Sequence, residues 1–330
     1  MTRARLAGRP ALLALALATA AVVGCSANAY YDQSYLPAEH NHAFRDRHPR
    51  ADRFFNAFDY GHATLSELLY TRLDDAPARL EGHEFDWIVR HLLVDPPKLP
   101  LDGAAIAPNF TRFAPDVHEM FEWSHMLHRQ IYDILADDRI PPDRRDEEVA
   151  RVMRYYRSRR NVAFSTTPKD MELMDGQPYS GTFRAKAPKF NGLIWAYHWM
   201  QVAVYEALLT GATPDERKAL VTAVLERFSS MVDAPGHLPT VMPMTAAVAP
   251  TFAARYPDAA IVFDNLHAMH DVVSDILTAH ADDRAAQRQE LLTAVARYRD
   301  DTSAVTTRAE WLEMSRTMDV RRMGGSAITR

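Results

Sequence analysis

The stretch FEWSHMLHRQIYDIL, residues 121–135, decides the fold class, because the chain repeats it as FDNLHAMHDVVSDIL at residues 263–277. The two stretches have Phe, His, His, Asp, Ile and Leu at the same positions, and an acidic residue follows the Phe in both. Their apolar residues recur with the 3.6-residue period of an amphipathic helix. We therefore predict two equivalent histidine-bearing helices, over about 115–137 and about 258–280.

The similarity continues on both sides of these helices. Asp-Asp-Arg follows each of them, at 137–139 and 282–284, and a charged amphipathic helix comes next. In each half a long helix, at about 50–73 or about 190–210, precedes a shorter helix and a proline-bearing connection. A duplicated pair of helical hairpins can close into a four-helix bundle. The predicted fold is an all-α helical bundle with an internal pseudo-twofold duplication around four long helices.

Composition and repeat pattern together predict the domain organisation. The chain has 330 residues, 47% of them hydrophobic, which suits a globular protein with a sizeable core. We predict a single all-α domain over 46–320, with half-repeats at about 46–160 and 186–300. A tether over 25–45 and a disordered tail over 321–330 flank it. The net charge of −5 argues against a nucleic-acid partner.

The chain begins with the pattern of a secretory leader. A segment with three arginines precedes the apolar run ALLALALATAAVV at 11–23, which is short for a membrane span, and Gly24-Cys25 follows. The stretch VVGC resembles a bacterial lipoprotein cleavage box. That resemblance implies a signal peptide over 1–24 and a lipid on Cys25, which is the only cysteine. The lipid would attach the protein to the membrane, which is the predicted partner. Ser26 then favours the outer membrane, facing the periplasm; an ordinary signal peptide is the alternative.

Each predicted long helix carries a histidine on its apolar ridge. Helical periodicity places His62, His128, His198 and His270 there, towards the centre of the bundle. An imidazole that is buried without a partner costs about 1–3 kcal/mol, so four of them indicate mutual satisfaction or a bound ligand. In this arrangement His125 and His267 add an H-x-x-H pair on each of two helices, and Asp59 precedes His62 by three residues as a further acid-x-x-His pair. Such an imidazole-rich site suits zinc, copper, nickel or iron. Two facing histidines could alternatively hold a non-covalent haem.

A second arrangement uses residues on the flanks of the histidine helices. Glu122 precedes His125 by three residues, and Asp264 precedes His267 by three, so a carboxylate and an imidazole lie side by side on each helix. This order resembles the ferritin-like di-iron and di-manganese carboxylate bundles. The resemblance covers four helices and implies that Glu67 and Glu206 supply the single carboxylates, and that dioxygen or peroxide is activated or iron is stored. Asp264 departs from the glutamate of that pattern and shortens one ligand.

The two arrangements need helix rotations that differ by roughly a quarter turn, and the sequence leaves both open. The predicted metal ligands are His62, Glu122, His125, His128, His198, Asp264, His267 and His270, with Glu67 and Glu206 as second choices. The predicted function is a lipid-anchored envelope protein that binds a transition metal (iron, manganese, zinc or copper), with redox or oxygen-activating chemistry as its implied use. The alternatives are a helical scaffold with a structural histidine network and a carrier of non-covalent haem or another small ligand. Enzymatic turnover and the identity of a redox or protein partner stay open.

Overall fold

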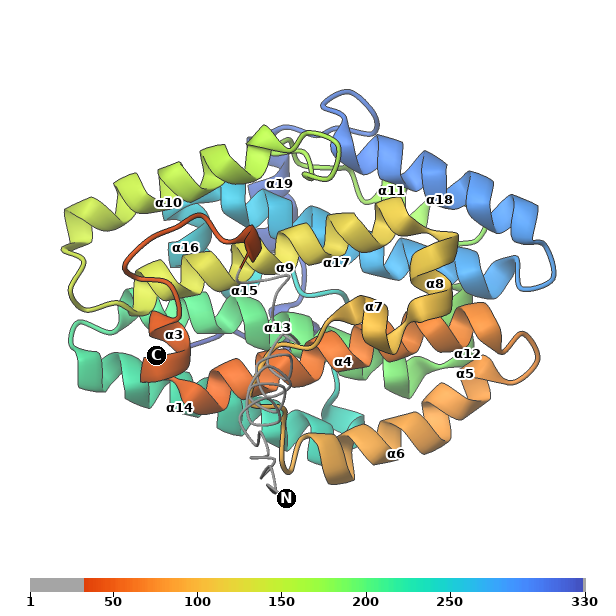
Figure 1. Cartoon of the computed structure of the whole chain (residues 1–330), viewed down its shortest axis with the longest axis horizontal. Helices are drawn as coiled ribbons and strands as arrows, with labels where there is room; N and C mark the ends of the chain where they lie inside the picture. The colour runs from red at the N-terminus through yellow and green to blue at the C-terminus, as the bar shows by residue number, and fades with distance from the viewer. Residues whose placement is uncertain (1–32, 329–330) are drawn as a thin grey trace, which may run out of the picture.

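The computed structural model describes residues 33–328, and within them the prediction of an all-α bundle is confirmed (Figure 1). The predicted signal peptide and Cys25 lie outside the described residues. Long helices pack side by side along the longest axis of the molecule, and short helices connect them. No helix within 33–328 is both long enough and apolar enough to cross a membrane.

The first half runs from α3 to α10. It contains α3 (Ala43–Arg47), α4 (Pro49–Thr71), α5 (Ala76–Arg79), η1 (Leu80–Glu84), α6 (Phe85–Trp87), η2 (Ile88–Leu92), α7 (Gly103–Ile106), α8 (Pro108–Phe113), α9 (Pro115–Ala136) and α10 (Pro142–Ser158). Segments α5 to η2 follow one another directly, and η1 and η2 are π-helical. They form the shorter helix that we predicted between the two long ones.

The second half repeats this order. It contains α12 (Thr182–Lys186), α13 (Pro188–Thr210), α14 (Pro214–Asp233), η3 (Pro235–His237), α15 (Thr245–Val248), α16 (Pro250–Arg255), α17 (Pro257–Ala279) and α18 (Arg284–Arg299). Helix α11 (Glu172–Asp175) lies between the halves, and α19 (Arg308–Thr317) and η4 (Val320–Met323) follow the second half. Thr213 and Glu216 form a capping box at the start of α14.

The internal duplication is confirmed helix by helix. Pro49 of α4 corresponds to Pro188 of α13 at an offset of 139 residues, and Pro115 of α9 corresponds to Pro257 of α17 at an offset of 142. All four prolines occupy the first helical position, where the missing N–H is not needed and the fixed φ favours a helix. Residue 42 before α3 and residue 181 before α12 both have left-handed backbone conformations, with φ of 72° and 74°. The two halves therefore share their turns as well as their long helices.

The four long helices α4, α9, α13 and α17 form the centre of the molecule. Helix α10 packs on α9, α18 packs on α17, and α14 packs on α13 (Figure 1). Every residue of α13 from 190 to 208 is buried, because this helix is apolar nearly all round and is covered on several sides. Side chains on the facing surfaces of these four helices are consequently removed from bulk water.

Two predicted boundaries are wrong because tertiary contacts order segments that have little apolar sequence. Residues 33–45 of the predicted tether belong to the fold: Phe44 is buried, and the Asp133 carboxylate caps α3 by accepting the backbone N–H groups of His42 and Phe44, each at 2.9 Å. Residues 321–328 of the predicted disordered tail are also ordered. Met323 is buried, and the Trp199 indole donates to the Gly325 carbonyl at 2.6 Å. The half-repeats accordingly begin with α3 and α12, slightly before the predicted 46 and 186.

Candidate metal centre

Six buried histidines meet where the four long helices face one another. They are His62 from α4, His125 and His128 from α9, His198 from α13, and His267 and His270 from α17, and each is at most 7% exposed. We call these six residues the histidine cluster. The structure thus brings together every histidine of the predicted ligand set, from both the ridges and the flanks.

Three members of the histidine cluster turn their ring nitrogens towards one point. The Nε2 atom of His198 lies 3.2 Å from Nε2 of His62 and 3.2 Å from Nδ1 of His270. One ligand atom from each of the three lies within 4.8 Å of those of the other two, and no other such group of three occurs among residues 33–328. We call this group site I.

Hydrogen bonds alone do not give every ring nitrogen of site I a partner. The carbonyl of Phe58 can only accept, so Nδ1 of His62 donates to it at 3.2 Å, and Nε2 of the same neutral ring has a free lone pair. If Nε2 of His198 carries a proton, this single proton is shared between the neighbouring ring nitrogens of His62 and His270. If Nε2 of His198 carries no proton, its lone pair faces the lone pair on Nε2 of His62. The Nδ1 atom of His198 has no hydrogen-bond partner in either case.

A metal ion at site I would resolve this conflict, because it would accept several lone pairs at once. Metal–nitrogen distances of about 2.0–2.1 Å in a tetrahedral site put neighbouring nitrogen ligands about 3.3–3.4 Å apart. The two contacts of 3.2 Å made by His198 are close to that spacing. The hydrogen bond from His62 to Phe58 would also hold the ligand ring in the tautomer that binds metal through Nε2. Site I could therefore hold a metal ion.

The protonation state of site I suits metal binding as well. Burial lowers the pKa of His62 to about 3. Burial, together with the neighbouring histidines, also lowers the pKa values of His198 and His270 well below 6.5. The three imidazoles are therefore neutral at pH 7, which is the form that coordinates metals.

The other three histidines surround site I in a similar environment. Both ring nitrogens of His125 and both of His267 are buried without a hydrogen-bond partner. His128 is hydrogen-bonded through Nδ1 to the Tyr205 hydroxyl at 2.8 Å, while its Nε2 has no partner. Unpaired buried nitrogens are destabilising unless a ligand or ordered water contacts them. Several such nitrogens occur together in the histidine cluster, where a bound ligand could satisfy them.

The predicted carboxylate ligands lie elsewhere, at the ends of short helices. Glu67 accepts the backbone N–H groups of Asn109 and Phe110 at the start of α8, and Glu206 accepts those of Thr251 and Phe252 at the start of α16. A carboxylate is stabilised at a helix N-terminus by these donors and by the helix dipole. Neither second-choice residue therefore joins the histidines.

Glu122 and Asp264 also point to short helices. Asp264 accepts hydrogen bonds from the N–H and hydroxyl of Thr245 and from the Trp311 indole, at 2.6–2.8 Å. Glu122 lies against Gly103, the residue of the first half that corresponds to Thr245. The structure brings the flank histidines to the cluster but not the flank carboxylates, and the geometry supports the ridge arrangement.

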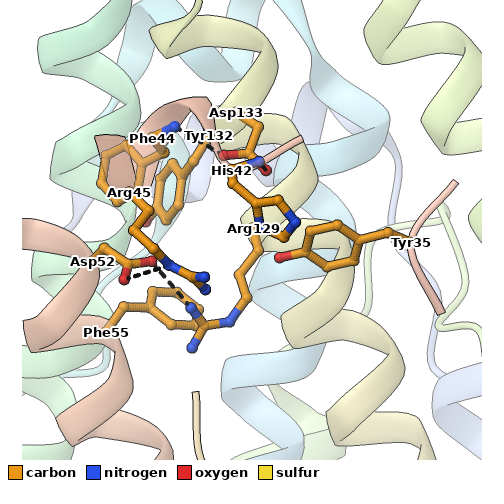
Figure 2. A pocket seen from close by; sticks show the side chains of 9 residues that line it. All are labelled: Tyr35, His42, Phe44, Arg45, Asp52, Phe55, Arg129, Tyr132 and Asp133. Carbon is orange, nitrogen blue, oxygen red and sulfur yellow. Dashed lines mark hydrogen bonds and ion pairs between the residues drawn. The ribbon is translucent and has the colours of Figure 1, made fainter. Parts of the chain in front are cut away.

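One carboxylate beside the cluster is absent from the predicted ligand set. Asp59 Oδ1 lies 3.6 Å from Nδ1 of His125, and its Oδ2 accepts from Arg129 at 2.5 Å. Burial raises the pKa of Asp59 to about 6, although Arg129 opposes the shift. Figure 2 shows Arg129 reaching past Phe55 to Asp52, next to a cavity of about 10 Å³. The sequence marks Asp59 through its spacing to His62, and an alignment of 49–71 with 188–210 adds that Asp59 corresponds to His198.

The haem alternative gains no support from this geometry. The facing nitrogens of His62 and His198 are 3.2 Å apart, which leaves no room for a porphyrin plane between them. The ring of His198 also stacks on that of His267, with centroids 4.1 Å apart.

Comparison with known proteins adds no further guide to function: no family model, no curated protein and no solved structure matches this chain.

Proposed function

We propose that this protein is a lipid-anchored protein of the cell envelope that binds a transition-metal ion at site I. The observation that carries the metal proposal is the position of His198, whose Nε2 lies 3.2 Å from a ring nitrogen of His62 and from one of His270. Three neutral imidazoles with converging nitrogens are a common donor set for transition metals.

The donor set also restricts the metal. Imidazole suits zinc, copper and iron, whereas manganese is usually held by carboxylates and water. Since the three ligands are neutral, none of them compensates the charge of the ion, and the free energy of burying an ion rises steeply with its charge. Copper(I) therefore needs the least compensation, and zinc and iron are the next candidates. Copper or iron would give the site redox activity, and zinc would not.

Metal analysis of the full chain, purified without a histidine tag and exposed to copper, zinc or iron, tests this proposal. We expect at least one equivalent of metal in the natural protein and a large loss in His198→Leu. Glu206→Ala is the matched control, because it removes a buried acidic residue that caps α16 and does not face site I. This variant should lose about 1 kcal/mol of stability and keep its metal. A natural protein that takes up none of the three metals would refute the proposal.

The lipid anchor has a separate test. Cys25→Ser should abolish incorporation of labelled palmitate and release the protein from the membrane fraction, because the thiol is the predicted acylation site. Equal membrane recovery of the natural protein and the variant would contradict the anchor. It would leave the metal proposal unaffected.

A further inference from the structure

The duplication gives site I a counterpart in the same core. At the offsets of 139 and 142 residues, His62 corresponds to Gln201, His198 to Asp59, and His270 to His128. The two remaining histidines, His125 and His267, correspond to each other. We propose that Asp59, His128 and Gln201, with His267 beside them, form a second metal site, which we call site II. This inference rests on the proposed metal binding at site I.

Contacts around the two sites agree with this correspondence. The ring centroid of His125 lies 5.8 Å from that of His270 at site I, and the ring centroid of His267 lies 5.9 Å from that of His128 at site II. Both histidines lie between the sites, because His267 also stacks on His198 with centroids 4.1 Å apart and Nδ1 of His125 lies 3.6 Å from Oδ1 of Asp59. Phe121 packs on His270 with centroids 4.1 Å apart, and its counterpart Phe263 packs on His128 at 3.5 Å. The pseudo-twofold relation therefore extends to the side chains of the cluster.

Every residue of site II has a buried polar atom without a hydrogen-bond partner. These atoms are Nε2 of His128, both amide atoms of Gln201, both ring nitrogens of His267, and Oδ1 of Asp59, whose nearest charged neighbour on that side is Nδ1 of His125 at 3.6 Å. His128, Gln201 and His267 are fully buried, and Asp59 is 4% exposed. A buried amide that lacks both its donor and its acceptor partner is costly, on the order of 1–3 kcal/mol. A bound cation would be coordinated by lone pairs of the Gln201 amide oxygen, of the imidazole nitrogens and of the Asp59 carboxylate.

Site II differs from site I in its donors and its spacing. It combines imidazole nitrogens with a carboxylate and an amide oxygen, so it suits a divalent transition-metal ion better than copper(I). Arg129 holds the other oxygen of Asp59 at 2.5 Å, and among residues 33–328 site I is the only group of three His, Cys, Asp or Glu residues whose donor atoms lie within 4.8 Å of one another. The second ion is therefore bound more weakly than the first.

Cobalt(II) titration of the metal-free full chain, followed by its visible absorption and by bound metal per chain, tests site II. We expect two steps in the natural protein. Gln201→His gives site II an imidazole where site I has His62, and it should move the second step to at least roughly tenfold lower free cobalt. Gln201→Leu should remove the second step and keep the first. His62→Gln, which gives site I the residue of site II, should weaken the first step and keep the second.

The outcomes separate the two proposals. A single step that is weakened by His62→Gln and unchanged by both Gln201 variants would overturn site II and leave site I in place. A complete absence of cobalt, zinc and copper binding would overturn both. Circular dichroism of each variant checks the fold, and the gain expected in Gln201→His does not depend on the folding of Gln201→Leu.

Discussion

Metal loading is expected to raise the melting temperature of the metal-free protein by roughly 8–16 °C, and His198→Leu is expected to abolish this shift. A ligand that binds only the folded state at about 1,000 times its Kd adds about 4 kcal/mol of stability. For domains of about 150–250 residues each kcal/mol corresponds to roughly 2–4 °C, and the shift for this longer chain is at the lower end of the range. Calorimetry with zinc(II) and copper(I), before and after a chelator, measures it.

The same variant separates a metal site from a structural histidine network. In the network alternative, His198 stabilises the bundle through its two contacts of 3.2 Å, so His198→Leu would lower the stability of the metal-free protein. In the metal proposal, leucine removes a buried ring with an unpaired Nδ1, and the metal-free stability is unchanged or higher. A metal-induced shift of equal size in the natural protein and the variant would refute site I.

Acidification of the metal-free protein is expected to change the stability difference between His198→Leu and the natural chain by about 2 kcal/mol from pH 7 to pH 5, in favour of the variant. Burial lowers the folded-state pKa of His198 well below 6.5, whereas the unfolded chain binds the proton near 6.5. Below pH 6.5 protonation therefore stabilises only the unfolded chain, and the natural protein loses about 1.4 kcal/mol per pH unit at this residue.

The stability difference between His198→Leu and the natural protein is free of the contributions that other buried titratable groups make to the pH dependence. The carboxyls of Asp59, Asp133 and Asp271 have pKa values raised by burial, to about 6, 7 and 7, and their protonation stabilises the folded state as the pH falls. These contributions are common to the variant and the natural protein and cancel in the comparison. Denaturant unfolding at pH 7 and pH 5 gives the two free energies. A pH-independent difference would mean that His198 is not buried in its neutral form.

The four long helices could be predicted because their signals are local. The repeated stretches at 121–135 and 263–277, the apolar periodicity and the prolines at helix starts all act within a few turns of chain. The charged helix predicted after the second Asp-Asp-Arg is α18, and the sequence TPDE at 213–216 forms a capping box at the start of α14. The histidines could be assigned to the centre by the same periodicity.

The roles of the carboxylates could not be predicted, because they depend on segments distant in sequence. Glu67 caps a helix that begins 41 residues later at Pro108, and nothing in its own helix distinguishes that role from metal binding. Likewise, Asp133 orders α3 from about 90 residues away, so a polar segment became part of the fold. To choose between the ridge and flank arrangements of ligands, one must know how each helix is rotated about its axis. Periodicity does not determine that rotation.

The donors of site I come from both halves of the chain: His62 belongs to the first, and His198 and His270 belong to the second. The halves are thus comparable to two subunits of a homodimer, with the proposed metal site in the interface between them. Neither repeat carries a complete donor set, so a gene encoding one repeat would need to produce a pair of chains before it could capture a metal. Within one chain the two copies can differ at equivalent positions, as His62 and Gln201 do.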